Sequence, residues 1–465
     1  MYTQDTICAV ATAQGGAIGI IRVSGPEAIT VADRIFSPAS QDGLPLSGRK
    51  PYTLTFGTIR DAGGEVVDEV LVSLFRAPHS YTGEDSVEIS CHGSSYILQQ
   101  VMQLLIRNGC RAAGPGEFTQ RAFLNGKMDL SQAEAVADLI ASSSAATHRL
   151  AMNLMKGGFS KELAALREKL LHLTSLMELE LDFSDHEELE FADRSELKAI
   201  AAQIEQVIGG LVRSFSTGNA IKNGIPVAII GETNAGKSTL LNALLNEERA
   251  IVSDIHGTTR DVIEDTMNIG GVTFRFIDTA GIRETSDTIE SLGIERSFQK
   301  LEQADIVLWV IDRSAPHPDF SRLAGQILPR CAGKHLIVVW NKADLSGTDA
   351  AASLKEVLPQ AEMISISAKA RTGIRELQDM LLRAADIPEI TQSNVIVTNV
   401  RHYEALSKAL EAIHRVQEGM DMGLSGDLVS QDLRECLFHL AEIVGGEITT
   451  DEVLGNIFKH FCIGK

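Results

Sequence analysis

The stretch IPVAIIGETNAGKSTLLNALL at residues 225–245 decides the fold of the central part of this chain. An apolar run is followed by a loop of the pattern GxxxxGK plus Ser or Thr at 231–238, and then by a helical pattern. The glycines let main-chain N–H groups converge on phosphate oxygens at the start of a helix. Lys237 is expected to reach the β and γ phosphates, and the Ser238 hydroxyl is expected to bind Mg²⁺. A turn with a purely structural role would need neither side chain, so the stretch predicts a nucleotide site.

The surrounding residues 225–387 alternate short apolar runs with helical patterns. This rhythm is typical of βαβ units and predicts a mainly parallel sheet with helices on both faces. Residues 262–269 and 272–277 flank Gly270-Gly271, and both glycines accept the positive φ that a tight hairpin needs. The sheet is therefore expected to carry one antiparallel edge strand. The other strands are expected at 226–230, 305–311, 335–340 and 363–367.

Two later motifs are typical of Mg²⁺ and γ-phosphate contacts. The sequence GTTRD at 257–261 offers Thr259, whose hydroxyl is expected to complete the Mg²⁺ shell once the γ phosphate orders the loop. The sequence DTAG at 278–281 follows the hairpin. Asp278 is therefore expected to hold Mg²⁺ through a water, and the Gly281 N–H is expected to meet the γ phosphate.

Two further motifs predict that the base is guanine. The sequence NKAD at 341–344 closes an apolar strand, and the Asp344 carboxylate can accept hydrogen bonds from N1–H and the exocyclic amine of guanine. Adenine would leave this carboxylate unpaired, at a cost of about 1–3 kcal/mol. The sequence SAK at 367–369 follows the last strand and is expected to contact the base. Five motifs in this order resemble a Ras-like GTPase of the translation-factor class.

The hydrolytic apparatus departs from the pattern of Ras. Ile282 follows Gly281, and its aliphatic side chain cannot orient a water as Gln does in Ras, so another group must do so. Asn234 in the phosphate loop offers a neutral oxygen ligand next to the phosphates. A monovalent cation bound there would supply the positive charge that an arginine finger gives elsewhere. The alternative for Asn234 is a simple hydrogen bond within the loop.

Length and composition bound the class of protein. The chain has 465 residues, which favours about three domains, and its 44% hydrophobic residues are typical of folded proteins. A net charge of −20 argues against non-specific binding to phosphate backbones. The six cysteines form no CxxC pair, so neither a disulfide framework nor a zinc site is predicted. Neither a signal pattern nor an apolar run of about 18 residues is found, which favours a soluble protein of the cytoplasm.

The flanking patterns predict the domain organisation. Residues 1–118 mix short apolar runs with Gly and Pro and predict a small α/β domain, whereas 119–222 and 388–465 show helical periodicity. The simplest topology inserts a nucleotide domain, 223–387, between two halves of one helical domain. Eight acidic residues at 178–193 are either a metal cluster or a solvated helix end.

Six segments outside the nucleotide motifs carry a resemblance to a known family. They are DTI at 5–7, GAIGIIRVSG at 16–25, YTGED at 81–85, PGEF at 115–118, RAFLNGK at 121–127 and FCIGK at 461–465. Together they resemble the MnmE (TrmE) family of tRNA modification GTPases over essentially the whole chain. The GTPase motifs alone would also fit ribosome-assembly GTPases, so these segments decide between the families.

The resemblance implies a multidomain α/β plus all-α fold. A Ras-like GTPase domain is inserted into a helical domain, and the N-terminal α/β domain binds folate and dimerises. The implied ligands of a 5-formyl or 5,10-methylene tetrahydrofolate are Arg22, Glu88, Lys127 and Lys465. Cations suit the folate glutamate, and a carboxylate suits the pterin amine. For isolated charged residues, an ordinary surface ion pair is the alternative.

The resemblance also implies residue roles in the GTPase domain. Potassium-stimulated dimerisation of these domains implies K⁺ ligands at Asn234, Ser253, Ile255 and Thr258. Glu290 is the implied catalytic acid/base, acting through a bridging water together with the charge of Lys237. The residues implied to bind nucleotide or its cations are Asn234, Ala235, Gly236, Lys237, Ser238, Thr239, Ser253, Asp254, Ile255, His256, Gly257, Thr258, Thr259, Asp278, Thr279, Ala280, Gly281, Asn341, Lys342, Ala343, Asp344, Ser367, Ala368 and Lys369.

The function implied by the resemblance is tRNA modification by a homodimeric GTPase. With an FAD-dependent partner of the MnmG (GidA) type, it forms the 5-carboxymethylaminomethyl or aminomethyl group on the wobble uridine, using a tetrahydrofolate one-carbon unit. GTP hydrolysis drives conformational change, and folate and flavin carry the carbon chemistry. Cys462 is implied as a nucleophile, with packing as its alternative. The alternative function is a switch GTPase that binds ribosome-assembly intermediates, which gives no reason for folate binding.

Overall fold

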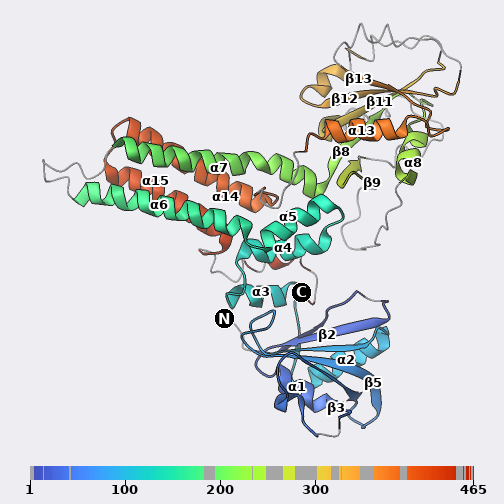
Figure 1. The fold of residues 1–465 in the computed structure, drawn as a ribbon, viewed down its shortest axis with the longest axis vertical. Helices are drawn as coiled ribbons and strands as arrows, with labels where there is room; N and C mark the ends of the chain where they lie inside the picture. Colours follow the sequence, from blue (N-terminus) through green and yellow to red (C-terminus); the bar gives the residue numbers. More distant parts are fainter. Residues whose placement is uncertain are drawn as a thin grey trace. The chain divides into compact units, whose positions relative to one another are not determined.

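The fold is that of a computed structural model, which describes most of the chain (Figure 1). The described residues are 5–13, 15–40, 43–182, 194–232, 234–247, 265–277, 301–315, 324–325, 327–345, 361–387, 395–446, 454, 457–459, 461 and 464. Contacts divide the chain into two compact units. One unit comprises Met1–Ala141, Ala151–Ile208 and Glu404–Lys465, and the other comprises Ser142–Leu150 and Gly209–Tyr403.

A seven-stranded sheet forms the N-terminal part of the first unit. Its order is β3-β4-β5-β6-β2-β1-β7, and among the described strands only the pair β1 and β7 is parallel. The helices α1 and α2 pack against it (Figure 1). The bounds are β1 Ile7–Val10, β2 Ile18–Ser24, α1 Ala28–Ile35, β3 Phe36–Pro38, η1 Leu46–Gly48, β4 Thr53–Arg60, β5 Val66–Phe75, β6 Ser86–His92, α2 Ser95–Arg107 and β7 Arg111–Ala112.

Alternation along the strands explains why this sheet has one packed face. In β5 the side chains of Val70, Val72 and Leu74 are buried, and the residues between them are more exposed. Antiparallel sheets with one face on the core show this period of two. The buried set joins Val101 and Leu105 of α2 in one hydrophobic cluster. The α/β character expected for this part of the chain is confirmed.

Helices make up most of the rest of the first unit. Three of them, α5 (Ala145–Met155), α7 (Arg194–Asn223) and α14 (Val400–Asp421), also contain residues of the second unit. Figure 1 shows α6, α7, α14 and α15 running alongside one another. Ion pairs of 2.6–2.7 Å join α7 to α14, α14 to α15 and α15 to α6: Lys198–Asp421, Arg415–Asp432 and Arg434–Glu178. The bounds are α3 Glu117–Leu124, α4 Leu130–Ala141, α5 Ala145–Met155, α6 Gly158–Asp182, α7 Arg194–Asn223, α14 Val400–Asp421 and α15 Gly426–Val444.

These pairings place helices from before and after the central sheet in one bundle. Exposed ion pairs contribute at most about 1 kcal/mol each, so buried leucines such as Leu170, Leu433 and Leu440 hold the bundle together. The central segment is thus an insertion into a helical domain. Glu178, the first of the eight acidic residues, pairs with Arg434, and the other seven side chains lie outside the described ones.

A six-stranded sheet forms the core of the second unit, in the order β13-β12-β11-β8-β10-β9. The described strands are parallel except for β9, which pairs antiparallel with β10 at the edge. The predicted hairpin and edge strand are therefore confirmed for the described residues. The bounds are β8 Ile225–Ile230, α8 Lys237–Glu247, β9 Asp265–Ile269, β10 Val272–Phe276, β11 Ile306–Asp312, η2 Leu328–Cys331, β12 His335–Asn341, β13 Glu362–Ser365 and α13 Ile374–Ala384.

Both faces of this sheet are buried, as the continuous apolar runs predict. Val227 and Leu308 join a cluster with residues of α8 and α13, whereas Ala228 and Trp309 join a second cluster on the opposite face. Since successive side chains of a strand point to opposite faces, each strand feeds both clusters. No helix in the described part of the chain has a run long and apolar enough to cross a membrane.

Candidate functional site

The phosphate loop at 231–238 joins β8 to α8 at the carboxyl edge of the six-stranded sheet. Both glycines of the loop are required by close approaches. A Cβ on Gly231 would lie 2.2 Å from the Val310 main-chain oxygen, and a Cβ on Gly236 would lie 2.2 Å from Asn341 Nδ2. Gly236 also has a φ of +95°, which side chains rarely adopt. The loop therefore sits directly against the strand ends.

Positive charge gathers at the start of α8. Lys237 is the first residue of this helix, and its Nζ donates hydrogen bonds of 2.8 Å to the main-chain oxygens of Gly231 and Glu232. The first main-chain N–H groups of a helix and its dipole both favour an anion. Ser238 and Thr239 follow in the same turn, and exposed Asn234 has a φ of +64°. The loop can thus hold a phosphate group between the ammonium and the helix N-terminus.

The side chain of Asn341 links three of the sequence motifs by hydrogen bonds. It ends β12, only 2% of it is exposed, and its Nδ2 donates a 2.9 Å hydrogen bond to the Ala235 main-chain oxygen. Its Oδ1 accepts a 3.0 Å hydrogen bond from the Ala368 N–H. The phosphate loop, the NKAD motif and the SAK motif are therefore joined by one buried amide.

Asp344 and Ser367 form the next pair at the same edge. The Ser367 hydroxyl donates a 2.5 Å hydrogen bond to Asp344 Oδ1, and it accepts one from the Ala370 N–H. The bond from Ser367, helped by the charges of Lys369 and Lys342, lowers the pKa of the exposed Asp344 carboxyl. Asp344 is therefore ionised at neutral pH, as an acceptor for two guanine N–H groups must be.

Asp312 is a residue of this site that was not predicted. It is the last residue of β11, and its Oδ2 lies 2.6 Å from Lys342 Nζ. The signal available in the sequence is a polar residue directly after the apolar run 306–311, at the same edge as the motifs. The other predicted residues of the nucleotide site lie outside the described part of the chain: Ser253, Asp254, Ile255, His256, Gly257, Thr258, Thr259, Asp278, Thr279, Ala280, Gly281 and Glu290.

A second candidate site lies on the N-terminal sheet. Arg22 and Glu88 are direct partners on the antiparallel strands β2 and β6, and Glu88 Oε1 accepts hydrogen bonds from Arg22 Nε and Nη2 at 2.9 and 2.8 Å. The guanidinium lies 5.2 Å from the ring centre of Tyr81 and 5.7 Å from that of Phe118, within the range of cation–π attraction. About a fifth to a quarter of each charged side chain is exposed.

Lys127 lies against the loop that carries Tyr81. Its Nζ donates a 2.9 Å hydrogen bond to the Pro78 main-chain oxygen, and Asn125 Nδ2 donates one of 2.7 Å to the Thr82 oxygen. The structure therefore pairs Arg22 with Glu88 and attaches Lys127 to the neighbouring loop. Lys465 and Cys462 lie outside the described residues.

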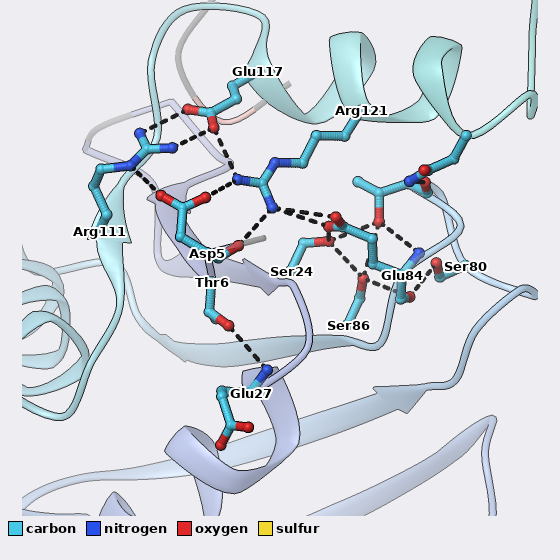
Figure 2. A network of polar contacts seen from close by, with 12 residues as sticks. Asp5, Thr6, Ser24, Glu27, Ser80, Glu84, Ser86, Arg111, Glu117 and Arg121 are labelled. Atoms are coloured by element: carbon cyan, nitrogen blue, oxygen red, sulfur yellow. Dashed lines mark hydrogen bonds and ion pairs between the residues drawn. The ribbon is translucent and has the colours of Figure 1, made fainter. Parts of the chain in front are cut away.

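A polar network centred on Arg121 supports this part of the sheet (Figure 2). Arg121 is 3% exposed, and it pairs with Asp5 at 2.6 Å, Glu117 at 3.0 Å and Glu84 at 3.2 Å. Arg111 binds the same carboxyl groups of Asp5 and Glu117. Two arginines thus neutralise carboxylates from three segments that are far apart in the sequence.

The network reaches the second candidate site through neighbouring residues. Glu84 accepts a 2.7 Å hydrogen bond from the Ser24 hydroxyl at the end of β2, the strand that carries Arg22. The Tyr81 and Thr119 hydroxyls share a 2.8 Å hydrogen bond. The strand, the Tyr81 loop and α3 are therefore fixed relative to one another around Arg22.

Comparisons with known proteins find the same family for the N-terminal, helical and full-length parts of the chain. The family model described as the MnmE helical domain matches residues 130–462, and the one described as the GTP-binding protein TrmE N-terminus matches residues 6–127. The tRNA modification GTPase MnmE of Bacteroides thetaiotaomicron is 71% identical, over 99% of this chain and 100% of that protein. Its counterpart in Bacteroides fragilis is 70% identical over the same shares. A crystal structure of Aquifex aeolicus Era bound to GDP·AlF4− is 31% identical, covers 40% of this chain and 66% of that one, and gives a TM-score of 0.28.

Proposed function

Because this chain belongs to the MnmE family of tRNA modification GTPases, we propose that it adds a group derived from a one-carbon unit to the wobble uridine of tRNA. The family membership makes it a GTPase that acts in tRNA modification. The observation that carries the proposal is the 71% identity to a protein of that name over 99% of this chain. The proposed product is the 5-carboxymethylaminomethyl or aminomethyl group.

The phosphate loop supplies the nucleotide contacts in this proposal. Lys237 exchanges its two main-chain partners for the β and γ phosphates of GTP, which lie at the N-terminus of α8. The hydroxyl of Ser238, which follows Lys237 in the first turn of the same helix, is proposed to bind Mg²⁺, with Thr259 and Asp278 as further proposed ligands. Ionised Asp344 accepts from the guanine N–H groups, and adenine would leave it unpaired.

Hydrolysis is proposed to depend on Asn234 and Glu290. Asn234 is an exposed residue of the phosphate loop, and its amide oxygen is a neutral, hard ligand of the type that suits K⁺. Bound K⁺ would supply positive charge near the transferred phosphoryl group. Ser253, Ile255 and Thr258 are the other proposed ligands. Glu290 is proposed to orient the attacking water through a bridging water, in the role that Ile282 cannot fill.

The N-terminal sheet is proposed to hold the tetrahydrofolate. Glu88 can accept from the pterin amine, and Lys127 can pair with a glutamate carboxylate at the other end of the folate. Arg22 is bonded to Glu88, so it is proposed to hold that carboxylate at the pterin end. Both side chains are partly exposed and bordered by the rings of Tyr81 and Phe118, which supports a planar ligand at this position. Lys465 completes the proposed set, and Cys462 is proposed as a nucleophile in the modification reaction. Folate supplies the one-carbon unit, and an FAD-dependent partner of the MnmG type supplies the redox step.

Nucleoside mass spectrometry of bulk tRNA tests the proposal. A strain that lacks the gene is expected to lose the modified wobble uridine, and the wild-type gene is expected to restore it. The R22Q and E88Q variants are expected to restore it poorly, whereas the variant D379N, with a change at an exposed carboxylate of α13, is expected to restore it fully. Unchanged tRNA in the deletion strain would contradict the proposal and favour a ribosome-assembly switch. The protein is further proposed to act as a homodimer in the cytoplasm.

A further inference from the structure

The carboxylate of Asp312 is held at both of its oxygens. Oδ2 accepts a 2.6 Å hydrogen bond from Lys342 Nζ, and Oδ1 accepts hydrogen bonds from the Ser314 N–H at 2.8 Å and the Ser314 hydroxyl at 2.6 Å. Asp312 and Asn341 are direct partners on the parallel strands β11 and β12. The carboxylate is therefore fixed at the strand edge where the NKAD motif begins.

Lys342 lies between two residues of the proposed guanine site. Asn341 before it is clamped to the phosphate loop, and Asp344 after it is the proposed acceptor for the base. Lys342 itself has a φ of +66°, a conformation that non-glycine residues rarely adopt. This backbone conformation and the bond to Asp312 together set the direction of the long side chain.

We propose that Asp312 is a positioning residue for guanine nucleotides, acting through Lys342. By holding the ammonium group, it keeps the lysine side chain extended along one side of the site before the nucleotide arrives. A lysine that is already ordered loses less rotamer entropy when the nucleotide binds. The inference rests on the proposed placement of guanine at residues 341–344 and adds a determinant of affinity that lies outside the five motifs.

The low exposure and the hydrogen bonds of Asp312 and Lys342 support an ordered ion pair. Only 30% of the Lys342 side chain and 19% of the Asp312 side chain are exposed, so the pair is partly withdrawn from solvent. Ser314 satisfies the oxygen that Lys342 does not reach, so the carboxylate stays in place when a nucleotide approaches the lysine. A hydrogen bond to a charged partner is also stronger than a neutral one.

The test is a double-mutant cycle on the full-length protein. D312N keeps an oxygen for Ser314 but loses the charge, and K342M keeps an aliphatic side chain but loses the ammonium. Binding of GDP that carries an N-methylanthraniloyl fluorophore is measured for wild type, D312N, K342M and the double variant. D312N is expected to weaken binding about tenfold, the change that corresponds to freeing one lysine side chain. In the K342M background, D312N is expected to change the affinity for GDP less than twofold.

Steady-state kinetics distinguish the proposed role from a merely structural one, because a structural defect would not raise KM alone. The KM for GTP is expected to rise in D312N, whereas kcat at saturating GTP is expected to stay near the wild-type value. The variant D379N serves as the matched carboxylate control and is expected to behave as wild type. Wild-type affinity in D312N, or an equal loss of affinity with and without Lys342, would overturn the inference.

A further variant separates this inference from the proposed guanine site. If D344A fails to weaken GDP binding, the placement of guanine at the NKAD motif is wrong, and the inference fails with it. If D344A weakens binding and D312N does not, the guanine site stands and only the role of Asp312 is refuted. Unfolding of the second unit, followed by the fluorescence of Trp309 and Trp340, shows whether D312N is folded. Should D312N be unfolded, K342M alone is expected to show the tenfold loss, and wild-type affinity in K342M would overturn the inference.

Discussion

The side-chain nitrogen Nδ2 of Asn341 lies 2.9 Å from the main-chain oxygen of Ala235, a residue 106 positions earlier in the chain. This bond is buried, and the same amide also accepts from the Ala368 N–H. One side chain therefore sets the distance between the loop that is proposed to hold the phosphates and the two motifs that are proposed to hold the base.

The variant N341A is expected to lose both nucleotide affinity and stability. It leaves a buried carbonyl and a buried N–H unpaired, and each unpaired group costs about 1–3 kcal/mol. GDP affinity is expected to fall more than tenfold. Both tryptophans, Trp309 and Trp340, lie in the six-stranded sheet, so their fluorescence during urea unfolding measures the stability of that unit. The variant N223A, at an exposed asparagine, is the matched control. A wild-type unfolding curve for N341A would contradict the proposed importance of the two buried hydrogen bonds of Asn341.

The variant G236A tests the same contact from the other side. Its new Cβ would lie 2.2 Å from Asn341 Nδ2, and the φ of +95° is strained for alanine. GDP binding is expected to fall by at least a hundredfold, because the loop must move away from β12. Gly325 has no neighbour within 4 Å of a built Cβ, so G325A is the control, with wild-type binding expected. Equal GDP affinities of G236A and G325A would refute the close approach of Gly236 to Asn341.

The strands of the six-stranded sheet and its hairpin turn could be predicted from the sequence because they depend on local patterns. The continuous apolar run of β8 and the Gly270-Gly271 turn are each visible within ten residues, and the structure confirms both elements. The carboxyl ends of parallel strands share one edge, which explains why the motifs after β8 and β12 lie in contact. The roles of the site residues stay predictions.

The long-range polar partners could not be predicted in the same way. Asp5 and Arg121 are 116 residues apart, and no periodicity shows which carboxylate meets which arginine. Arg22 and Glu88 were singled out as separate charges, but their contact depends on the register of β2 against β6. A shift of one residue would move these side chains to opposite faces. Asp312 was missed for a related reason, since its partner Lys342 belongs to another strand end.

The Asp5 carboxyl should make the N-terminal sheet sensitive to acid. Burial raises the pKa of Asp5, but the bonds and charges of Arg111 and Arg121 outweigh this effect and lower it from 3.8 to about 2. The stabilisation is therefore complete above about pH 4 and is lost as the pH falls towards 2. The shift corresponds to roughly 2 kcal/mol, which partial exposure of Asp5 reduces to about 1 kcal/mol.

The variant D5N is expected to lose this stabilisation at pH 7 and to resemble wild type at pH 2. Hydrogen exchange at the amides of β1 reports on the N-terminal sheet, which contains no tryptophan. The exposed Glu69 of β5 provides the control E69Q, for which no pH-dependent difference is expected. A difference between D5N and wild type that stays constant from pH 7 to pH 2 would rule out the ionised carboxylate as its source.

Two buried cysteines should resist alkylation in the folded protein. Burial and the charge of Asp68 raise the pKa of Cys91 to about 11, and burial with the charge of Glu435 raises that of Cys436 to about 12. At pH 8 the reactive thiolate is then roughly 0.1% of Cys91 or less. Mass spectrometry after iodoacetamide treatment is expected to find both thiols unmodified at pH 8 and both modified in 8 M urea. Rapid labelling of either cysteine in the folded protein would contradict the burial.

The variant E290A tests the proposed route of hydrolysis, because Ile282 cannot orient a water. Glu290 is proposed to act on the attacking water and not on the bound nucleotide, so E290A is expected to bind GTP with wild-type affinity. Its turnover is expected to fall by about 10²–10⁴, the usual contribution of a general base. Single-turnover hydrolysis in KCl measures this step directly, and fluorescent GDP titration checks that the site is intact. D379N provides the control for loss of one carboxylate in the same unit. Hydrolysis at the wild-type rate in E290A would assign the water to another group and leave the nucleotide contacts of Asn341 and Asp344 unaffected.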